Sequence, residues 1–141
     1  VIFGERVKIV EPCNLYDCVL CDDVFIGPFV EIQAGVRIGD GTRVQSHSFV
    51  CEGVTIGEDC FVGHGVMFIN DKFKNNGPAR GDKNLWGITS IGNRVSIGSN
   101  ATLLPVNVCD DVVIGAGAVV TKDICEPGIY LGNPAKKLQN N

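Results

Sequence analysis

Aliphatic residues recur at every sixth position through the first half of the chain. The positions are Ile26, Ile32, Ile38, Val44, Val50, Ile56 and Val62, and Phe68 ends the run. A small or β-branched residue stands two places before each of the first seven: Val24, Val30, Val36, Thr42, Ser48, Val54 and Cys60. Side chains two residues apart in an extended strand point to the same side. Both positions therefore face one interior, and the residues between them face outward: Phe25, Glu31, Arg37, Arg43, Phe49, Thr55 and Phe61.

A glycine often follows the aliphatic residue, as at positions 27, 39, 57 and 63. Glycine adopts turn conformations that a side chain would disfavour, so each six-residue unit is predicted to be a short strand and a corner. Three units would close a triangular coil of 18 residues, and the coils would stack at roughly 4.8 Å. An α-helix is excluded because a six-residue period does not keep to one helix face.

The same pattern resumes in the second half of the chain. Its aliphatic positions are Ile91, Ile97, Leu103, Val108, Ile114 and Val120, with Val95, Ala101, Val112 and Ala118 at the small position. The repeat predicts a single all-β domain over residues 1–141, a parallel β-helix with one extended loop and a short C-terminal tail. The first 20 residues fit less well, because Lys8 and Asn14 fall where aliphatic residues are expected. We interpret them as an irregular first coil.

Two defects interrupt the repeat. The first is a polar, glycine- and proline-containing insertion at about 71–87, which includes Asp71, Arg80 and the only tryptophan, Trp86. Long loops in compact folds are usually functional, so the loop is predicted to take part in the site. The second is one missing residue between Leu103 and Val108, which we interpret as a tolerated irregularity.

Composition and charge exclude several classes of protein. Among 141 residues, 45% are hydrophobic, 20% are charged and the net charge is −4. Abundant Val and Ile argue against disorder, the negative charge argues against a nucleic-acid partner, and no apolar run approaches the roughly 20 residues that span a bilayer. We expect neither a nucleic-acid nor a membrane partner.

Seven cysteines raise the questions of disulfides and zinc. Their odd number and scattered positions do not resemble a disulfide framework. Cys18 and Cys21 form a CxxC, but the second pair that a structural zinc site needs is missing. We expect no metal, and reduced cysteines that serve as small hydrophobic residues in a cytoplasmic protein.

Polar residues of adjacent predicted coils fall into vertical register. Glu52 and Asn70 are 18 residues apart, as are Ser46 and His64, and His47 is one step along. An 18-residue coil places such pairs one above the other. We therefore predict that these corner residues form a polar cluster beside the loop.

The recurring motif resembles the hexapeptide-repeat acyltransferases over nearly the whole chain, and the resemblance implies that the β-helix is left-handed. The stretch SHSFVCEGVTIGEDCFVGHGVMFIND (residues 46–71) resembles bacterial nucleotide-sugar N-acetyltransferases. The group it resembles acts on the 3-amino sugar of a nucleoside-diphosphate hexuronate or deoxyhexose, and acetyl-coenzyme A is the acyl donor. The resemblance thus implies N-acetylation of a nucleotide-linked amino sugar for surface polysaccharides such as lipopolysaccharide.

Phe68-Ile69-Asn70 matches the segment that ends a coil before the loop in that family. The resemblance implies that Asn70 lies at the sugar amine and that Glu52 is the family's acidic residue one coil earlier. An amide cannot act as a base but can orient the amine through its oxygen, and His64 or Glu52 could accept the proton. The chain departs from the family at Ile69 and at 72–74, which leaves the exact sugar open. We expect substrate contacts from His47, Asp71, Arg80 and Trp86.

The segments at 113–124 and 132–136 also match the superfamily. The resemblance implies that the pantetheine arm lies along the coil edge, where small side chains let it approach backbone amides. Lys136 and its neighbour Lys137 are candidates for the phosphates. Tight packing between coils would also explain the small residues. The expected coenzyme-binding residues are Gly98, Gly115, Ala116, Gly117 and Lys136.

Three other functions remain open. A sugar O-acetyltransferase would depend on His64 or His47 as a base. A γ-class carbonic anhydrase needs three histidine ligands, whereas the chain has two. A structural β-helix would need neither the loop nor the polar cluster. For the enzyme we predict a homotrimer with active sites between subunits, because several outward side chains are apolar: Phe25, Phe49, Phe61 and Met67.

Overall fold

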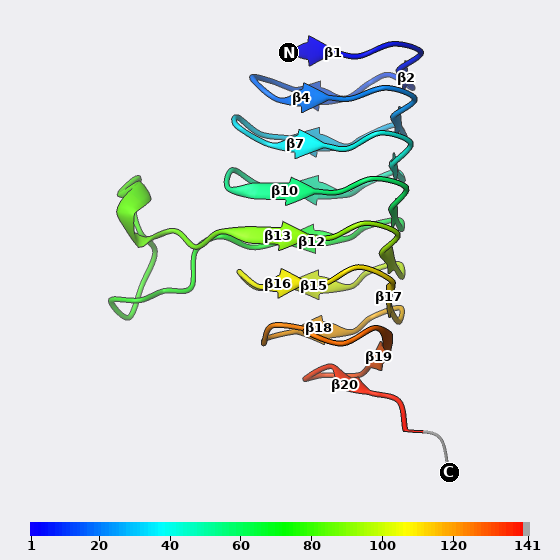
Figure 1. Cartoon of the computed structure of the whole chain (residues 1–141). Coiled ribbons are helices and arrows are strands. Elements are labelled where there is room, and N and C mark those ends of the chain that lie inside the picture. The colour runs from blue at the N-terminus through cyan, green and yellow to red at the C-terminus, as the bar shows by residue number, and fades with distance from the viewer. Residues whose placement is uncertain (140–141) are drawn as a thin grey trace.

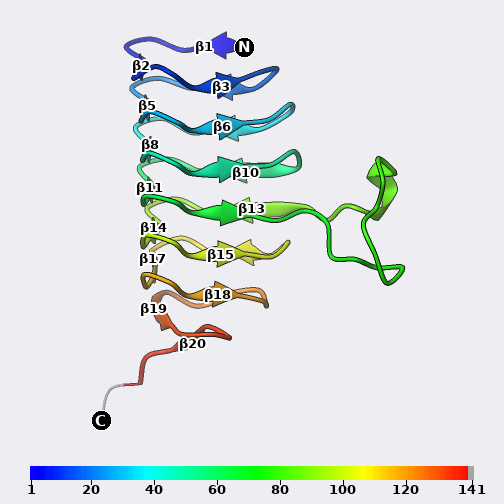
Figure 2. The same ribbon diagram turned by 180° about the vertical axis from the view of Figure 1, so that it is seen from behind.

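The computed structural model describes residues 1–139, which fold as a left-handed parallel β-helix with three sheets (Figures 1 and 2). The first sheet contains β1 (Ile2–Phe3), β4 (Val19–Leu20), β7 (Arg37–Ile38), β10 (Val54–Ile56), β13 (Thr89–Ile91) and β16 (Asn107–Val108). The second contains β2 (Lys8–Ile9), β5 (Phe25–Ile26), β8 (Arg43–Val44), β11 (Phe61–Val62), β14 (Ser96–Ile97), β17 (Val112–Ile114), β19 (Gly128–Leu131) and β20 (Lys136–Lys137). The third contains β3 (Asn14–Leu15), β6 (Glu31–Ile32), β9 (Phe49–Val50), β12 (Met67–Phe68), β15 (Thr102–Leu103) and β18 (Val119–Val120).

Three corners join these sheets in every coil. The first corner leads from the first sheet to the second, the second corner from the second sheet to the third, and the third corner back to the first sheet. All strand pairs are parallel except β19 with β20. The 18-residue coil is confirmed, because Arg43 pairs with Phe61 and Arg37 pairs with Thr55.

The predicted inward positions form the core. Every aliphatic residue of the run from Ile26 to Phe68 is at most 1% exposed. The two hydroxyl residues of this ladder are also buried, and their side chains replace missing backbone bonds. Thr42 Oγ1 donates to the carbonyl of Gly57 at 2.7 Å and accepts from the N–H of Cys60 at 3.0 Å, and Ser48 does the same one face along. Buried polar groups of this kind cost little because they are paired.

The interpretation of the first coil as irregular is wrong. Lys8 pairs with Phe25 and Asn14 with Glu31, so both are outward residues of regular strands, and Ile9 and Leu15 take the inward positions. A five-residue unit between Leu15 and Leu20 causes the shift, since these coils pair 17 residues apart. The missing residue between Leu103 and Val108 has the same effect on the register of β13 with β16. Both deletions lie at the third corner.

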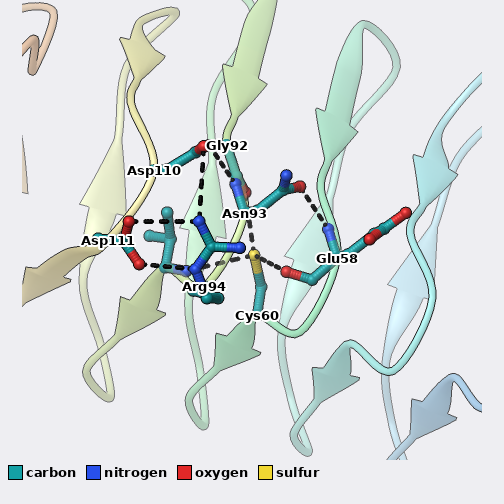
Figure 3. Close-up of polar contacts among 8 residues, drawn as sticks. Glu58, Cys60, Gly92, Asn93, Arg94, Asp110 and Asp111 are labelled. Atoms are coloured by element: carbon teal, nitrogen blue, oxygen red, sulfur yellow. Dashed lines mark hydrogen bonds and ion pairs between the residues drawn. The ribbon is translucent and has the colours of Figure 1, made fainter.

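Side chains of the next coil cap the first corner (Figure 3). The N–H of Glu58 donates to Asn93 Oδ1 at 2.9 Å, and the N–H of Asn93 donates to Asp110 Oδ1 at 2.7 Å. In the same way, the N–H of Glu5 donates to Asp22 Oδ1, and the N–H of Asp22 donates to Asp40 Oδ1. Beside the ladder, Arg94 donates to the carboxylate of Asp111 at 2.7 Å, and this contact lowers the pKa of that carboxyl. The repeated caps explain why acidic residues and asparagine gather at this corner.

Replacing Asn93 with alanine is expected to lower the free energy of unfolding by about 1 kcal/mol, because the N–H of Glu58 loses its acceptor. Chemical denaturation followed by circular dichroism would measure the change. Asn107→Ala is the matched control, since Asn107 is an exposed strand residue and its substitution is expected to stay within about 0.5 kcal/mol of zero. Equal effects of the two substitutions would contradict the capping role.

Most cysteines lie in or beside the core. Cys18, Cys51 and Cys60 are at most 2% exposed, and burial raises the pKa of the Cys51 thiol to about 11. Cys18 points inward while Cys21 lies at the following corner and is half-buried.

The only helical element in residues 1–139 is the 3₁₀ turn η1 (Lys83–Leu85). No helix in these residues is long and apolar enough to cross a membrane.

Candidate active site

The loop leaves the β-helix after β12 and returns at β13, where it projects sideways from the third corner (Figures 1 and 2). Asp71 organises its base: the carboxylate accepts from the N–H of Phe73 at 3.1 Å and from the N–H of Ala79 at 2.8 Å. Asp71 also forms an antiparallel bridge with Trp86. Because both carboxylate oxygens are used within the loop, the structure gives Asp71 a role in shaping it.

Glu52 and Asn70 are stacked at the third corner, as the 18-residue spacing predicts. Asn70 Nδ2 donates to the main-chain carbonyl of Glu52 at 3.0 Å. Only the NH₂ group of an amide can donate to a carbonyl, so this bond fixes the orientation of the Asn70 side chain. Within residues 1–139 no group donates to Asn70 Oδ1, which leaves a half-buried acceptor at the base of the loop.

Two residues that sequence reasoning missed hold Glu52 in place. Gln33 Oε1 accepts from the N–H of Glu52 at 3.1 Å. Lys83 Nζ lies 2.8 Å from one carboxylate oxygen of Glu52 and 3.2 Å from the other. Gln33 could have been found, because it occupies the same corner one coil earlier. Lys83 could not, since no periodicity places a residue of an irregular loop.

Arg80 and Trp86, the other loop residues predicted to bind the substrate, form no side-chain hydrogen bond with Glu52 or Asn70 within residues 1–139. Arg80 is exposed in a left-handed conformation, with φ of 55°, and forms no ion pair within the described part of the chain. Trp86 is half-buried where the loop returns, and the Lys83 ammonium lies 5.8 Å from the centre of its ring. The loop therefore presents an aromatic ring and a paired cation at the third corner.

The histidines lie at the second corner. Ser46 and His64 are stacked there, and the carbonyl of Ser46 accepts from the N–H of Gly65 at 3.0 Å. His47 has a left-handed backbone, with φ of 64°, and its ring stacks on Phe29 at 5.0 Å. Both histidines are exposed.

The expectation of one polar cluster is wrong within a single chain. His64 precedes β12 and Asn70 follows it, so the two residues lie at opposite ends of one face of the triangular coil. Six residues of extended chain span roughly 20 Å, which is beyond the reach of either side chain. The candidate site therefore consists of two half-sites: Glu52 and Asn70 with the loop, and Ser46, His47 and His64 at the second corner.

The second corner differs from the first in its backbone. At the first corner, acidic and asparagine side chains accept the corner N–H groups of four coils, which belong to Glu5, Asp22, Glu58 and Asn93. At the second corner the equivalent N–H groups make no hydrogen bond within residues 1–139; they belong to Ser46, His64, Ser99 and Ala116. These N–H groups form a row of unpaired donors at successive coils.

Four of the residues expected to bind the coenzyme lie along this row: Gly98, Gly115, Ala116 and Gly117. A side chain on Gly98 would collide with the backbone of Ala116, so tight packing explains that glycine, whereas one on Gly115 would meet only the end of the exposed Leu131 side chain. Gly117 differs: φ is +69° and nothing lies within 4 Å of the position that a Cβ would take, so the backbone is open there. Lys136 is exposed on β20, whereas Lys137 pairs with Glu126 at 3.2 Å. The open backbone and Lys136 fit an extended amide-containing ligand with a charged end.

Two repeat families match the chain. Residues 17–52 match the family described as bacterial transferase hexapeptide (six repeats). Residues 53–67 and 88–122 match the family described as hexapeptide repeat of succinyl-transferase. Together the matched ranges cover more than half of the chain, and the gap between them coincides with the loop.

Curated relatives include the bifunctional protein GlmU of Acidithiobacillus ferrooxidans, which is 30% identical over 159 residues. The alignment covers 95% of this chain and 35% of that protein. GlmU of Thermotoga petrophila is 29% identical, with 92% and 30% covered. The chain thus spans about a third of the length of these relatives.

Solved structures share the fold. One is a variant of perosamine N-acetyltransferase from Caulobacter crescentus in complex with CoA and GDP-perosamine, with a TM-score of 0.70, 22% identity, and 99% of this chain and 58% of that chain covered. Another is a hexapeptide-repeat acetyltransferase from Vibrio cholerae complexed with acetyl-CoA, with a TM-score of 0.71, 21% identity, and 88% and 70% covered. The periodic core, the two matching repeat families and these folds agree, and the chain belongs to the hexapeptide-repeat transferase family.

Proposed function

We propose that this protein transfers an acetyl group from acetyl-coenzyme A to the amine of a nucleotide-linked amino sugar, as a step in the synthesis of surface polysaccharides. The observation that carries the proposal is the fixed amide of Asn70. Its Nδ2 is bound to the Glu52 carbonyl, and its Oδ1 is an unpaired acceptor within the described residues. An acceptor in this state suits the N–H of a sugar amine.

The chemistry of the acceptor follows from the third corner. An amine attacks a thioester only when it is neutral, so a proton must be lost before or during attack. Asn70 Oδ1 would orient the amine lone pair, and the carboxylate of Glu52, held on the same corner, would take the proton directly or through water. Positioning of two substrates can contribute on the order of 7–11 kcal/mol to the lowering of the barrier. The fixed amide is therefore the residue whose loss should matter most.

The donor half is assigned to the second corner. Acetyl-coenzyme A supplies an activated thioester when bound. The unpaired N–H groups of Ser99 and Ala116 would pair with amide carbonyls of the pantetheine arm or with the thioester oxygen as it gains charge, and Lys136 would contact the phosphates. Coenzyme A or acetyl-CoA accompanies the neighbouring folds from C. crescentus and V. cholerae, which supports acetyl-coenzyme A as the donor.

Two half-sites on separate corners call for a second copy of the chain. Packing the second corner of one subunit against the third corner of its neighbour would bring a donor half to an acceptor half. Apolar side chains flank the second corner on both sides: Phe61 is 42% exposed on the second sheet and Met67 is 41% exposed on the third, while Phe25 and Phe49 are half-buried. We propose a homotrimer with active sites between subunits.

Analytical ultracentrifugation at micromolar concentration is expected to give a mass three times that of the 15.1 kDa chain. Replacing Phe61 and Met67 together with glutamate should shift the protein toward smaller species, because charge would replace apolar contact area. A double substitution on the first sheet, Thr55→Glu with Ser90→Glu, is the matched control. A wild-type protein that sediments as a monomer would contradict the trimer.

A panel of nucleoside-diphosphate-linked amino sugars, with acetyl-coenzyme A, tests the proposed function. Release of the coenzyme A thiol and a mass increase of one acetyl group on the sugar are the expected results. The panel should contain 3-amino and 4-amino sugars, GDP-perosamine among them, and each hydroxyl counterpart as the control. If none of the amino sugars in the panel causes thiol release, the proposal is overturned.

One observation favours a second candidate, a sugar O-acetyltransferase. The ring of His64 is exposed and makes no hydrogen bond within residues 1–139, and it lies on the corner assigned to the donor. A hydroxyl must lose its proton during attack and needs a true base such as histidine. The hydroxyl members of the same panel decide between the two acceptors.

A further inference from the structure

Lys83 is the only loop cation with a carboxylate partner in the described chain. Its ammonium contacts both oxygens of Glu52, at 2.8 and 3.2 Å, whereas Lys72, Lys74 and Arg80 form no ion pair within residues 1–139. Its helical turn is fixed by Asp82, which caps η1 by accepting from the N–H of Asn84. A defined loop geometry thus delivers this one ammonium to the third corner.

The contact places a primary ammonium where the acceptor is assigned. Glu52 binds Lys83 through its carboxylate and Asn70 through its main-chain carbonyl. An amino sugar that enters the same corner would bring the same chemical group, a primary ammonium with three donors and one positive charge. We infer that the ammonium of Lys83 is an internal stand-in for the ammonium of the acceptor sugar, and that the substrate displaces it from Glu52. This inference rests on the proposed function.

The strength of the ion pair is suited to displacement. The side chains are 65% exposed for Lys83 and 31% exposed for Glu52. Pairs this exposed change an equilibrium by at most about fivefold, so a substrate held by several other contacts can replace the lysine. Trp86 offers the released ammonium another partner, since the ring centre is already 5.8 Å from Nζ and a cation over an indole face is attracted to it.

The inference predicts a direction for the change in substrate affinity when Lys83 is removed, and other roles of Lys83 predict the opposite direction. If Lys83 competes with the substrate, its removal should tighten binding of the amino sugar. If Lys83 instead contacted an anionic group of the substrate, or held Glu52 in a productive orientation, its removal should weaken binding. The direction of the change therefore separates the stand-in from both alternatives.

Titration calorimetry with the amino sugars of the panel, GDP-perosamine included, measures this direction. Lys83→Met should lower the dissociation constant by about two- to fivefold, and Glu52→Gln should raise it. In the Lys83→Met/Glu52→Gln double variant the gain should vanish, because the lysine then has nothing to release. Lys74→Met, an exposed lysine of the same loop, is the matched control and should bind as the wild type does. Weaker or unchanged binding by Lys83→Met overturns the inference.

Displacement can also be observed on the wild-type protein. An N-hydroxysuccinimide acetate reagent labels free lysine amines, and peptide mass spectrometry separates Lys83 from Lys74. Saturating amino sugar should raise the labelling rate of Lys83 relative to Lys74, while the hydroxyl counterpart of the sugar should not. A fall in the labelling of Lys83 on adding amino sugar would show that the substrate covers or contacts it, which contradicts displacement.

The outcomes of these experiments distinguish failure of the inference about Lys83 from failure of the proposed function. Failure of every amino sugar to bind or to accept an acetyl group removes the proposed function. Binding and acetylation with no gain in Lys83→Met and no rise in Lys83 labelling leave the function intact and reject the stand-in.

Discussion

Asn70→Ala is expected to lower kcat by about 100-fold or more while leaving the affinity for acetyl-coenzyme A nearly unchanged. The substitution removes the fixed acceptor that orients the amine, and losses of this size are typical when one preorganised polar group of an active site is removed. The donor contacts are assigned to the second corner, at the other end of the third sheet from Asn70, so the two effects should separate. Steady-state kinetics and coenzyme titration would measure them.

His64→Ala completes the experiment, because it decides which acceptor the enzyme uses. With an amine acceptor the substitution should cost less than Asn70→Ala, since a free amine needs only deprotonation before attack. With a hydroxyl acceptor it should abolish activity. The N-acetyl proposal fails if His64→Ala is inactive on every substrate while Asn70→Ala is close to wild type.

The six-residue period was sufficient to predict the coil length, the inward ladder and the outward positions. The reason is physical: a two-residue strand with a corner on either side has one inward side and no freedom to slip, so each residue's face follows from its place in the repeat. The prediction failed in the first coil, where a five-residue unit after Leu15 moved Lys8 and Asn14 outward. A period extrapolated across a deletion assigns every residue beyond it to the wrong side.

The site was predicted less well because residues stacked in adjacent coils are in contact, whereas residues at successive corners of one coil are far apart. The 18-residue spacing correctly stacked Glu52 on Asn70 and Ser46 on His64. We also expected the two pairs to form one cluster. They do not, because residues six positions apart lie at different corners of the triangular coil. Lys83 lies outside any period, and only the geometry of the loop brings it to Glu52.

The three corners have different chemistry on one repeating backbone. At the first, side chains cap the corner N–H groups of four coils, as Asn93 caps Glu58. The second lacks such caps in residues 1–139, and we assign its free N–H groups to the proposed donor half-site. The third carries both five-residue units and the loop. Changes in chain length are thus concentrated at the corner to which we assign the acceptor half-site, while the core ladder continues past each of them.

Removing the loop is expected to lower turnover by about 100-fold or more and to leave the β-helix folded. The chain permits a clean deletion, because the N–H of Gly87 donates to the carbonyl of Asn70 at 2.7 Å and the two ends of the loop already meet. Two glycines in place of residues 71–86 would keep both Asn70 and Gly87, and Gly87 is needed there because a side chain would collide with Pro105. The pairing of β10 with β13 does not involve the loop.

The measurements are the circular dichroism spectrum and unfolding midpoint for the fold, and kcat with acetyl-coenzyme A affinity for the site. We expect the first two and the coenzyme affinity to stay near wild type, because the deleted residues supply none of the inward ladder; Ala79 is buried but does not belong to the core cluster. Turnover should fall because the loop residues assigned to the substrate, Trp86 among them, are gone. Lys83→Met in the intact loop is the comparison: it removes only the proposed competing ammonium, so it should not reproduce the loss. Full activity in the loopless protein would place the acceptor site elsewhere on the β-helix.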